Sequence, residues 1–407
     1  MFVNQSARNP NEIGNAYYYA QNGHAYGPYS LADLRGLLSS GRIDTKVLVA
    51  ASGDEKWLPL HSLLAVAPYP ATNTVHRQDR RPTGSPKGLF SFLDCISGLP
   101  PAKSLPWKEI FKKSFAVNSE ADAEAVLLSG NSGQSVPWVF SRVLVGGLLS
   151  MVSLLWALET FENLKLIPGF FFVGCVTVPV ATLIFLMELC SASQLNGYRV
   201  AKAVVVGGLL SIIFTLVLND LPVVSSFTFT PMLAGPVEET AKLAAAMFIA
   251  RNWTRTRHVQ DGLVLSASVG AGFAMIETAG YIFESFLLIH DSGVALDWYG
   301  AVGTLSLRAI MSPFAHVLWA AVVVGSLWYS NRGSSKQIKG LCSHVFLRIF
   351  IFIVGLHAIW NSPFLLPFTD SFTAVFGKFA IIGASGWYVL LQLNNVDTHD
   401  AQQGDQL

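Results

Sequence analysis

The sequence is poor in charged residues and in cysteine, and both shortages restrict the class of protein. Only 13% of the 407 residues are charged, whereas 52% are hydrophobic. Soluble domains carry roughly a quarter of charged residues, so this composition indicates a membrane protein. The four cysteines show no Cys-x-x-Cys spacing, so neither a disulfide framework nor a cysteine metal site is expected.

Other missing features exclude further classes. The net charge is only +1 and no basic stripe is present, so nucleic acid is excluded as a partner. The first 15 residues are polar, which predicts that there is no cleavable signal peptide. The sequence also lacks the H-E-x-x-H motif, in which two histidines one turn apart on a single helix bind zinc.

Long hydrophobic runs begin after residue 136. A helix that spans a bilayer needs about 20 mostly apolar residues, and eight runs meet this requirement. The predicted helices cover 138–158, 166–189, 201–219, 227–250, 261–289, 302–329, 345–365 and 372–393. The fourth run contains Pro231, Gly235 and Pro236 besides three charged residues, so a broken or partly re-entrant helix is an alternative there.

The loops between these runs alternate in charge. Lysine and arginine fall in every second loop, at Arg199, Lys202, Arg251, Arg255, Arg257, Arg332, Lys336 and Lys339. The opposite loops carry Asp220, Asp291, Asp297 and Asp370 instead. Basic loops stay in the cytoplasm, so we expect a multi-pass protein of the bacterial inner (cytoplasmic) membrane with both termini in the cytoplasm.

The chain before the first run divides into two parts. Residues 15–62 predict a small soluble α+β domain on the cytoplasmic side, with aromatic strands and one leucine-rich helix. Residues 63–135 predict a linker in which Trp107, Ile110 and Phe111 share one face of an amphipathic helix that has lysines on its other face. That helix lies on the membrane surface or is an ordinary connector. The membrane domain is then 136–395, and 396–407 is a cytoplasmic tail.

Ionisable residues lie inside four of the predicted helices, where each charge costs at least about 2.5–3.5 kcal/mol. They are Glu238, Glu239 and Lys242 in the fourth helix, Glu277 in the fifth, Arg308 and His316 in the sixth, and His357, with Asn361, in the seventh. The spacing places Glu238 and Lys242 on one face and turns Glu239 about 100° away. His357 and Asn361 share a face by the same rule. Any one pair could be a polar contact between helices, but the whole set indicates a shared site.

The chemistry of this set suits amide hydrolysis. Two carboxylates with different neighbours can act as general base and general acid. A histidine and an asparagine can donate hydrogen bonds to the oxyanion of a tetrahedral intermediate. Because the site lies in the bilayer, we expect the substrate to be a membrane-anchored protein.

Four segments resemble the motifs of PrsW-type intramembrane proteases, which are distant relatives of CAAX-processing glutamate proteases. These segments are PVEETAK, GFAMIE, R-x7-H and HAIWN, in that order on successive helices. The resemblance covers roughly 136–395. It implies active-site roles for Glu238, Glu239, Glu277, His316 and His357, with Asn361, Lys242 and Arg308 supporting them. Thr278 departs from the family pattern, which more usually has asparagine after the glutamate.

The N-terminal part is similar to a bacterial GYF-like domain through its GPYS turn, its GRI segment and its WLPL ending. Such domains bind proline-rich peptides on an aromatic surface. The resemblance implies a peptide site among Tyr17, Tyr18, Tyr19, Tyr26, Tyr29 and Trp57. Several of these rings must fill the core of so small a domain, so a structural or regulatory role is the alternative.

Three alternatives remain open at this point. Metal-independent glutamate chemistry with no cofactor is favoured, but zinc is possible, with Glu277, His316 and His357 as ligands. A transporter could use buried Glu, Arg and His as an ion pathway, although no internal repeat is present. An inactive membrane scaffold could present the GYF-like domain.

Overall fold

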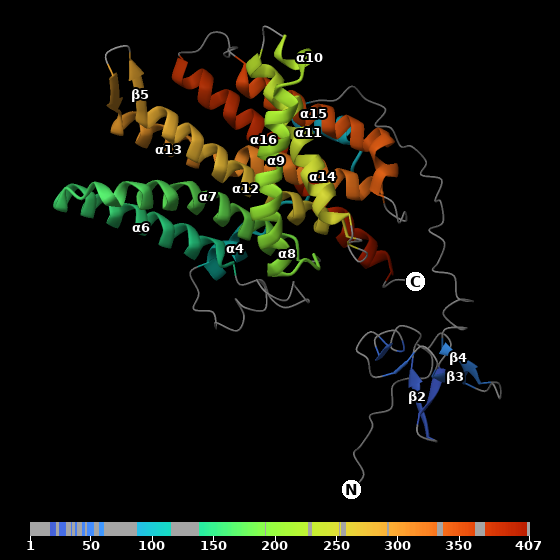
Figure 1. Cartoon of the computed structure of the whole chain (residues 1–407). Coiled ribbons are helices and arrows are strands. Elements are labelled where there is room, and N and C mark those ends of the chain that lie inside the picture. Colours follow the sequence, from blue (N-terminus) through green and yellow to red (C-terminus); the bar gives the residue numbers. More distant parts are fainter. Residues whose placement is uncertain are drawn as a thin grey trace. The chain divides into compact units, whose positions relative to one another are not determined.

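A computed structural model divides the chain into two units, residues 1–85 and 86–407, which are described separately (Figure 1). The structure describes residues 17–21, 24–29, 34, 37, 38, 43, 44, 47–52, 57–60, 88–114, 138–191, 193–226, 230–251, 253, 258–290, 293–331, 337–362 and 371–404.

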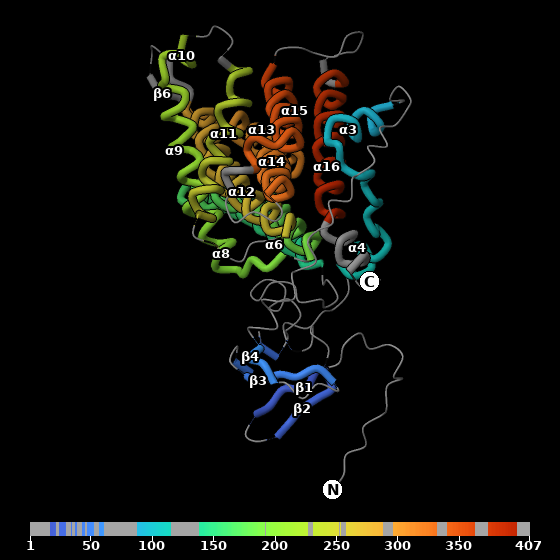
Figure 2. Tube along the Cα trace, turned by 90° about the vertical axis from the view of Figure 1, so that its right-hand side faces the viewer, coloured from blue at the N-terminus to red at the C-terminus, as the bar shows by residue number. Residues whose placement is uncertain are grey.

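The first unit is built on a small antiparallel sheet (Figure 2). Its strands are β1 (Tyr17–Gln21), β2 (His24–Tyr29), β3 (Leu48–Ala51) and β4 (Leu58–Pro59), in the order β2-β1-β3-β4. Tyr19 and Val49 face each other across β1 and β3 and are both buried. They pack with Leu34, Ile43 and Leu60 into one core. The predicted small N-terminal domain is confirmed.

The second unit is helical. Among its described residues, seven helices are long and apolar enough to cross a membrane. These spans cover Phe140–Phe161, Leu164–Leu189, Gly197–Asn219, Val259–Phe286, Trp298–Ser330, His344–Asn361 and Thr373–Val396. The remaining predicted run, the fourth (227–250), forms α11 (Thr230–Ala250), which is long enough but carries three charged residues. The chain is a multi-pass integral membrane protein.

The helices of this unit differ in places from single predicted spans. In chain order they are α3 (Leu89–Ser97), α4 (Trp107–Ser114), α6 (Phe140–Phe161), η2 (Leu164–Leu166), α7 (Ile167–Leu189), α8 (Gly197–Lys202), the π-turn η3 (Ala203–Gly207), α9 (Gly208–Asn219), α10 (Pro222–Ser225), α11, α12 (Val259–Phe286), α13 (Trp298–Met311), η4 (Ser312–Phe314), α14 (His316–Ser330), η5 (Gln337–Cys342), α15 (His344–Asn361) and α16 (Ser371–Gly404). A hairpin of β5 (Leu287–His290) and β6 (Gly293–Leu296) joins α12 to α13.

The predicted sixth helix, 302–329, is wrong as a single element. It is two helices, α13 and α14, separated by the tight turn η4. Pro313 lies in that turn, and proline cannot donate the hydrogen bond that a continuous helix requires there. The break is anchored by the Trp387 indole, whose Nε1 donates to the Pro313 carbonyl at 3.1 Å. His316 is therefore the first residue of α14 and not a mid-helix residue.

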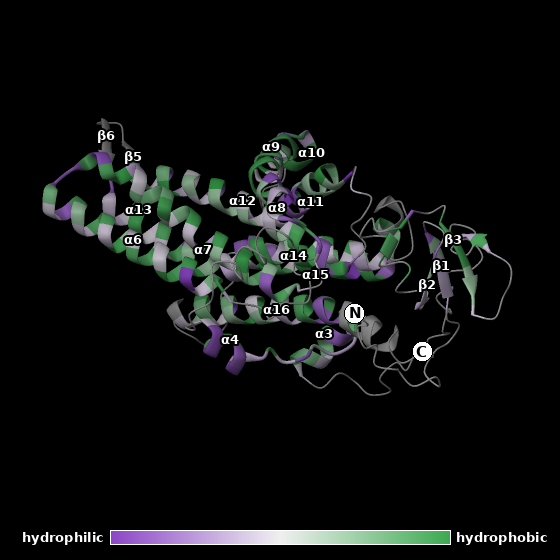
Figure 3. Cartoon of the chain, turned by 90° about the horizontal axis from the view of Figure 1, so that it is seen from below, coloured by the Kyte–Doolittle hydropathy of each residue, from purple (hydrophilic) through white to green (hydrophobic). Residues whose placement is uncertain are grey.

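The outer helices expose large apolar side chains, whereas the central helices bury theirs. On α6, Leu149, Val152 and Trp156 are more than 60% exposed, as expected for side chains that face lipid. The ribbons of α6 and α9 are likewise coloured mainly as hydrophobic in Figure 3. By contrast, nearly all of α14 and most of α12 are buried. The site residues lie on and around these two central helices.

Candidate active site

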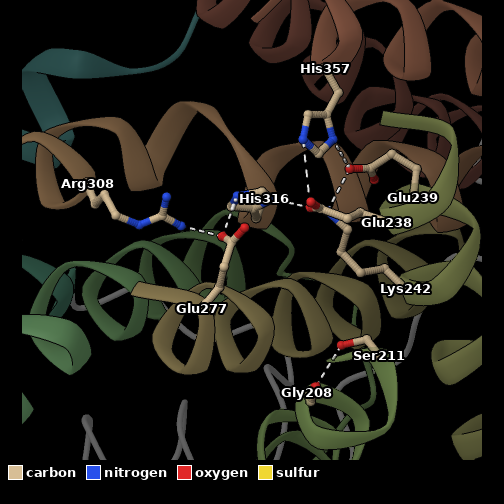
Figure 4. Close-up of polar contacts among 9 residues, drawn as sticks. All are labelled: Gly208, Ser211, Glu238, Glu239, Lys242, Glu277, Arg308, His316 and His357. Carbon is tan, nitrogen blue, oxygen red and sulfur yellow. Dashed lines mark hydrogen bonds and ion pairs between the residues drawn. The ribbon is translucent and has the colours of Figure 1, made fainter. Parts of the chain in front are cut away.

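Five helices bring the predicted ionisable residues together (Figure 4). The residues are Glu238, Glu239 and Lys242 on α11, Glu277 on α12, Arg308 on α13, His316 on α14 and His357 on α15. Each of them contacts at least one other member. The sequence-based expectation of one shared cluster agrees with this arrangement.

Two glycines allow these helices to approach closely. A Cβ atom on Gly235 of α11 would lie 2.8 Å from the Val354 carbonyl of α15. One on Gly270 of α12 would lie 2.5 Å from the His316 carbonyl of α14. Both distances are too short for any side chain, so only glycine permits the contact.

α11 is one continuous helix with Pro236 inside it, so the alternative of a broken fourth helix is wrong.

The buried end of the site is an ion-paired network around Glu239. Lys242 Nζ donates to Glu239 Oε1 at 2.6 Å, and His357 Nδ1 lies 2.9 Å from the same oxygen. The side chains of all three are at most 1% exposed. The predicted pair of Lys242 with Glu238 is also present, as a longer ion pair of 3.8 Å. Glu239, three residues away, shares the face equally well and is the carboxylate without access to water.

The more open end is built around Glu277. His316 Nε2 lies 2.9 Å from Glu277 Oε2, and the Arg308 guanidinium forms an ion pair with the same oxygen. Arg308 Nε donates to Thr278 Oγ1 at 3.0 Å. The unusual Thr278 thus serves as an acceptor that fixes Arg308. The side chains at this end are 13–22% exposed.

Glu238 lies between the two ends. Its Oε2 atom is 3.7 Å from His357 Nε2 and 3.6 Å from His316 Nδ1. This oxygen is buried and has no hydrogen-bond partner among the described residues. His357 therefore turns Nε2 toward Glu238 and holds Nδ1 against Glu239. His316 holds Nε2 against Glu277 and turns Nδ1 toward Glu238 and toward Lys242 Nζ, which lies 3.1 Å away.

Two regions of the chain match known protein families. Residues 197–390 match the profile described as PrsW family intramembrane metalloprotease, and residues 17–63 match the profile described as GYF domain 2. The chain carries a PrsW-type peptidase domain. No curated protein and no solved structure matches the chain. The PrsW-type match begins at α8, so α6 and α7 lie outside it.

One predicted member of the PrsW-type site does not join the cluster. Asn361 is the last residue of α15, one turn beyond His357, and is half-buried. Within the part of the chain that the structure describes, it makes no hydrogen bond to the clustered side chains.

Sequence reasoning did not identify two aromatic residues that contact the clustered side chains. The Trp319 ring packs on His357 at 4.4 Å between centroids, and Lys242 Nζ lies 4.7 Å from the centre of the Phe273 ring. Their spacing is a usable signal, because Trp319 is one turn after His316 and Phe273 one turn before Glu277. Both rings shield the buried end of the site from water.

The aromatic residues of the GYF-type domain divide into buried and exposed groups. Tyr19 is 8% exposed and stacks on Tyr26 and Tyr29, with ring centroids 5.2 and 5.7 Å apart. Tyr19 is therefore a core residue. Tyr26 and Trp57 are 42% and 37% exposed and are accessible to a ligand.

Proposed function

We propose that the cluster hydrolyses peptide bonds of membrane-anchored proteins, with Glu238, His316 and His357 surrounding the reacting atoms. The observation that carries this proposal is the buried Glu238 oxygen, which has no hydrogen-bond partner and faces one nitrogen of each histidine. A buried carboxylate oxygen without a donor is costly unless a ligand or a reacting group completes it.

The residues fit a divalent cation. Glu238, His316 and His357 each offer one ligand atom, and these atoms lie within 4.8 Å of one another. Two histidines and a glutamate are a donor set that zinc accepts. The opposite nitrogens rest on Glu239 and Glu277, as is usual for histidines that bind a metal. This set differs from the predicted alternative, in which Glu277 took the place of Glu238.

A zinc ion held there would polarise the substrate carbonyl and the attacking water. The other tasks fall to the chain itself. Glu238 offers Oε2 to the cation, so its other oxygen, Oε1, is the one that holds the water, accepts its proton and passes it to the leaving amine; Glu238 is 10% exposed, whereas Glu239 is sealed off. Glu239 and Glu277 fix the orientation of the two histidine rings. Lys242 offsets the charge of the two neighbouring carboxylates.

The test of this function compares membrane-protein fragments released by cells that express the wild type or Glu238→Gln. Glu284→Gln is the matched control, because Glu284 is exposed on α12 two turns beyond Glu277. We expect fragments that disappear in Glu238→Gln and persist in Glu284→Gln. Equal fragment profiles in all three, with every variant inserted in the membrane, would contradict the proposal.

The cation has its own test. Purified full-length protein should contain about one zinc per chain by elemental analysis, and Glu238→Gln and His316→Ala should each lower that content. Chelation should stop cleavage and added zinc should restore it. A metal-free wild type that cleaves at full rate would leave the acid–base role of Glu238 intact and remove zinc from the account.

We also propose that the GYF-type domain binds proline-rich peptides through Tyr26 and Trp57, since these exposed rings suit an extended proline helix. In the full chain, a proline-rich peptide should change the Trp57 fluorescence, and Tyr26→Ala should weaken the effect. The same response in Trp57→Phe would contradict it.

Both termini are proposed to lie in the cytoplasm. Labelling of cysteines introduced at residues 4 and 405 on intact cells would test this orientation.

A further inference from the structure

A large apolar cavity lies away from the catalytic cluster. It has a volume of about 910 Å³, and its walls come from α6, α7, η4 and α16. Phe140 and Val178 lie on one side, and Phe376 and Leu391 mark the extent of the α16 wall. None of the clustered residues lines this cavity, although Pro313 and Phe314 of η4, which do line it, come just before His316 in the chain.

The lining offers an occupant almost no polar partner. Thr182 lines the cavity, but its hydroxyl already donates to the Val178 carbonyl at 2.8 Å. The Trp387 indole also lines it, and its Nε1 donates to Pro313. An extended peptide would leave its own backbone groups without hydrogen bonds there, which is prohibitive away from water. The chemistry therefore favours a hydrocarbon occupant.

The length of the cavity suits an acyl chain. The α16 wall from Phe376 to Leu391 is about 22 Å long at 1.5 Å per residue. A lipid acyl chain is long, narrow and apolar, so it matches both the length and the polarity of the cavity.

A basic segment crosses one end of the cavity. α3 is fixed to α16, because Tyr388 Oη and Gln392 Nε2 each donate to Asp94 Oδ1 at 2.7 Å. α4 meets the start of α6, where Ser141 Oγ donates to the Ser114 carbonyl at 3.2 Å. Between these anchors, Ser104, Leu105 and Trp107 line the cavity.

Lysines lie next to these lining residues in the chain. Lys103, Lys108 and Lys112 are exposed and make no ion pair among the described residues, whereas Lys113 is paired with Glu109 at 2.7 Å. Unpaired lysines at the end of a membrane-spanning helix attract anionic lipid headgroups. We propose that the cavity holds an acyl chain of an anionic phospholipid whose phosphate contacts Lys103, Lys108 and Lys112. This inference does not depend on the proposed protease activity.

Two variants separate the acyl-chain site from the headgroup site. Ala380 and Ala384 line the cavity one turn apart on α16 and are exposed, so Ala380→Leu/Ala384→Phe fills the space without a buried clash. Ala201→Phe, on the exposed side of α8, is its control. Lys108→Gln/Lys112→Gln removes two headgroup contacts, and Lys165→Gln/Lys202→Gln removes the same charge at other exposed positions.

The experiment equilibrates delipidated full-length protein with equal amounts of phosphatidylglycerol and phosphatidylcholine in detergent and measures the retained lipid by mass spectrometry. The wild type should retain about one phosphatidylglycerol and little phosphatidylcholine. The cavity-filling variant should retain about ten-fold less lipid, because the apolar site is occupied. The lysine variant should still bind lipid but lose about ten-fold of its preference for phosphatidylglycerol. Both controls should behave as the wild type.

Equal retention of the two lipids by the wild type, or unchanged phosphatidylglycerol retention in the cavity-filling variant, would overturn the proposal. Thermal unfolding of each variant in the same detergent identifies any that fail to fold, and the lysine variant then decides alone. If the cavity-filling variant kept its lipid but lost cleavage of a membrane-anchored protein in phosphatidylcholine vesicles, the cavity would be a substrate-helix site and the lipid assignment would be wrong.

Discussion

The two ends of the site repeat one arrangement in two different environments. At one end a glutamate, Glu239, contacts a lysine and His357; at the other a glutamate, Glu277, contacts an arginine and His316. The side chains of the first end are at most 1% exposed, and those of the second are 13–22% exposed. Similar sets of side chains are therefore inaccessible at the first end and partly accessible at the second. This difference suggests that the first end holds the fold and that the second receives the substrate.

The largest effect is expected from Glu239→Gln. This change removes the short contacts of Lys242 and His357 with a carboxylate and leaves them only Glu238, at 3.8 and 3.7 Å. Removing one partner of a buried ion pair costs about 3–5 kcal/mol, so both stability and activity should fall. Thermal unfolding of the purified full chain, with Glu284→Gln as the control, measures the loss. An unfolding temperature equal to that of the control would mean that the buried end is not the structural one.

Glu277→Gln should separate activity from stability. Arg308 and Glu277 are 22% and 16% exposed, so the unpaired Arg308 is less confined than Lys242 and the stability loss should stay at about 1 kcal/mol. Cleavage should still fall strongly, because Glu277 fixes His316. The informative measurement is the ratio of the two effects in the same preparations. A stability loss as large as that of Glu239→Gln would abolish the distinction between the ends.

Arg308→Lys should give an intermediate effect. Arg308 contacts Glu277 and Thr278 at the same time through different nitrogens, and a lysine cannot reproduce that fork. Residues that orient a metal-binding or catalytic group typically change activity by about 10–100-fold. Kinetics of the purified variant on an identified substrate would measure it. Activity equal to the wild type would show that charge alone suffices.

Thr278→Val should give the smallest effect. It removes one hydrogen-bond acceptor for Arg308 Nε and leaves the ion pair with Glu277 in place. The expected change is about 1 kcal/mol or less in the activation free energy. Thr278→Asn keeps an acceptor at this position and should retain more activity than Thr278→Val. The reverse order would mean that Thr278 acts by its shape.

Much of this architecture could be predicted from the sequence. Eight hydrophobic runs, a small N-terminal domain and a gathering of Glu, Lys and His in the membrane follow from hydropathy and from the cost of buried charge. Pro313 could have predicted the break at η4, but the hydrophobic run continues on both sides of it and led to the prediction of a single helix.

The partners within the site could not be predicted. Positions three and four residues apart share a helix face, so the sequence cannot decide which of Glu238 and Glu239 lies closer to Lys242. Helix rotation and the approach at Gly235 make that choice. The same holds for Asn361, which shares a face with His357 by spacing but lies at the end of α15, outside the cluster.

The most direct test of the account is whether Glu238 and His316 act at one centre. The rates of substrate cleavage by Glu238→Gln, His316→Asn and the double variant would be compared under single-turnover conditions with purified full-length protein. Groups that act as a unit are strongly non-additive, so the double variant should be no slower than the slower single variant. If the two losses multiplied in the double variant, Glu238 and His316 would act independently and the shared centre would be wrong.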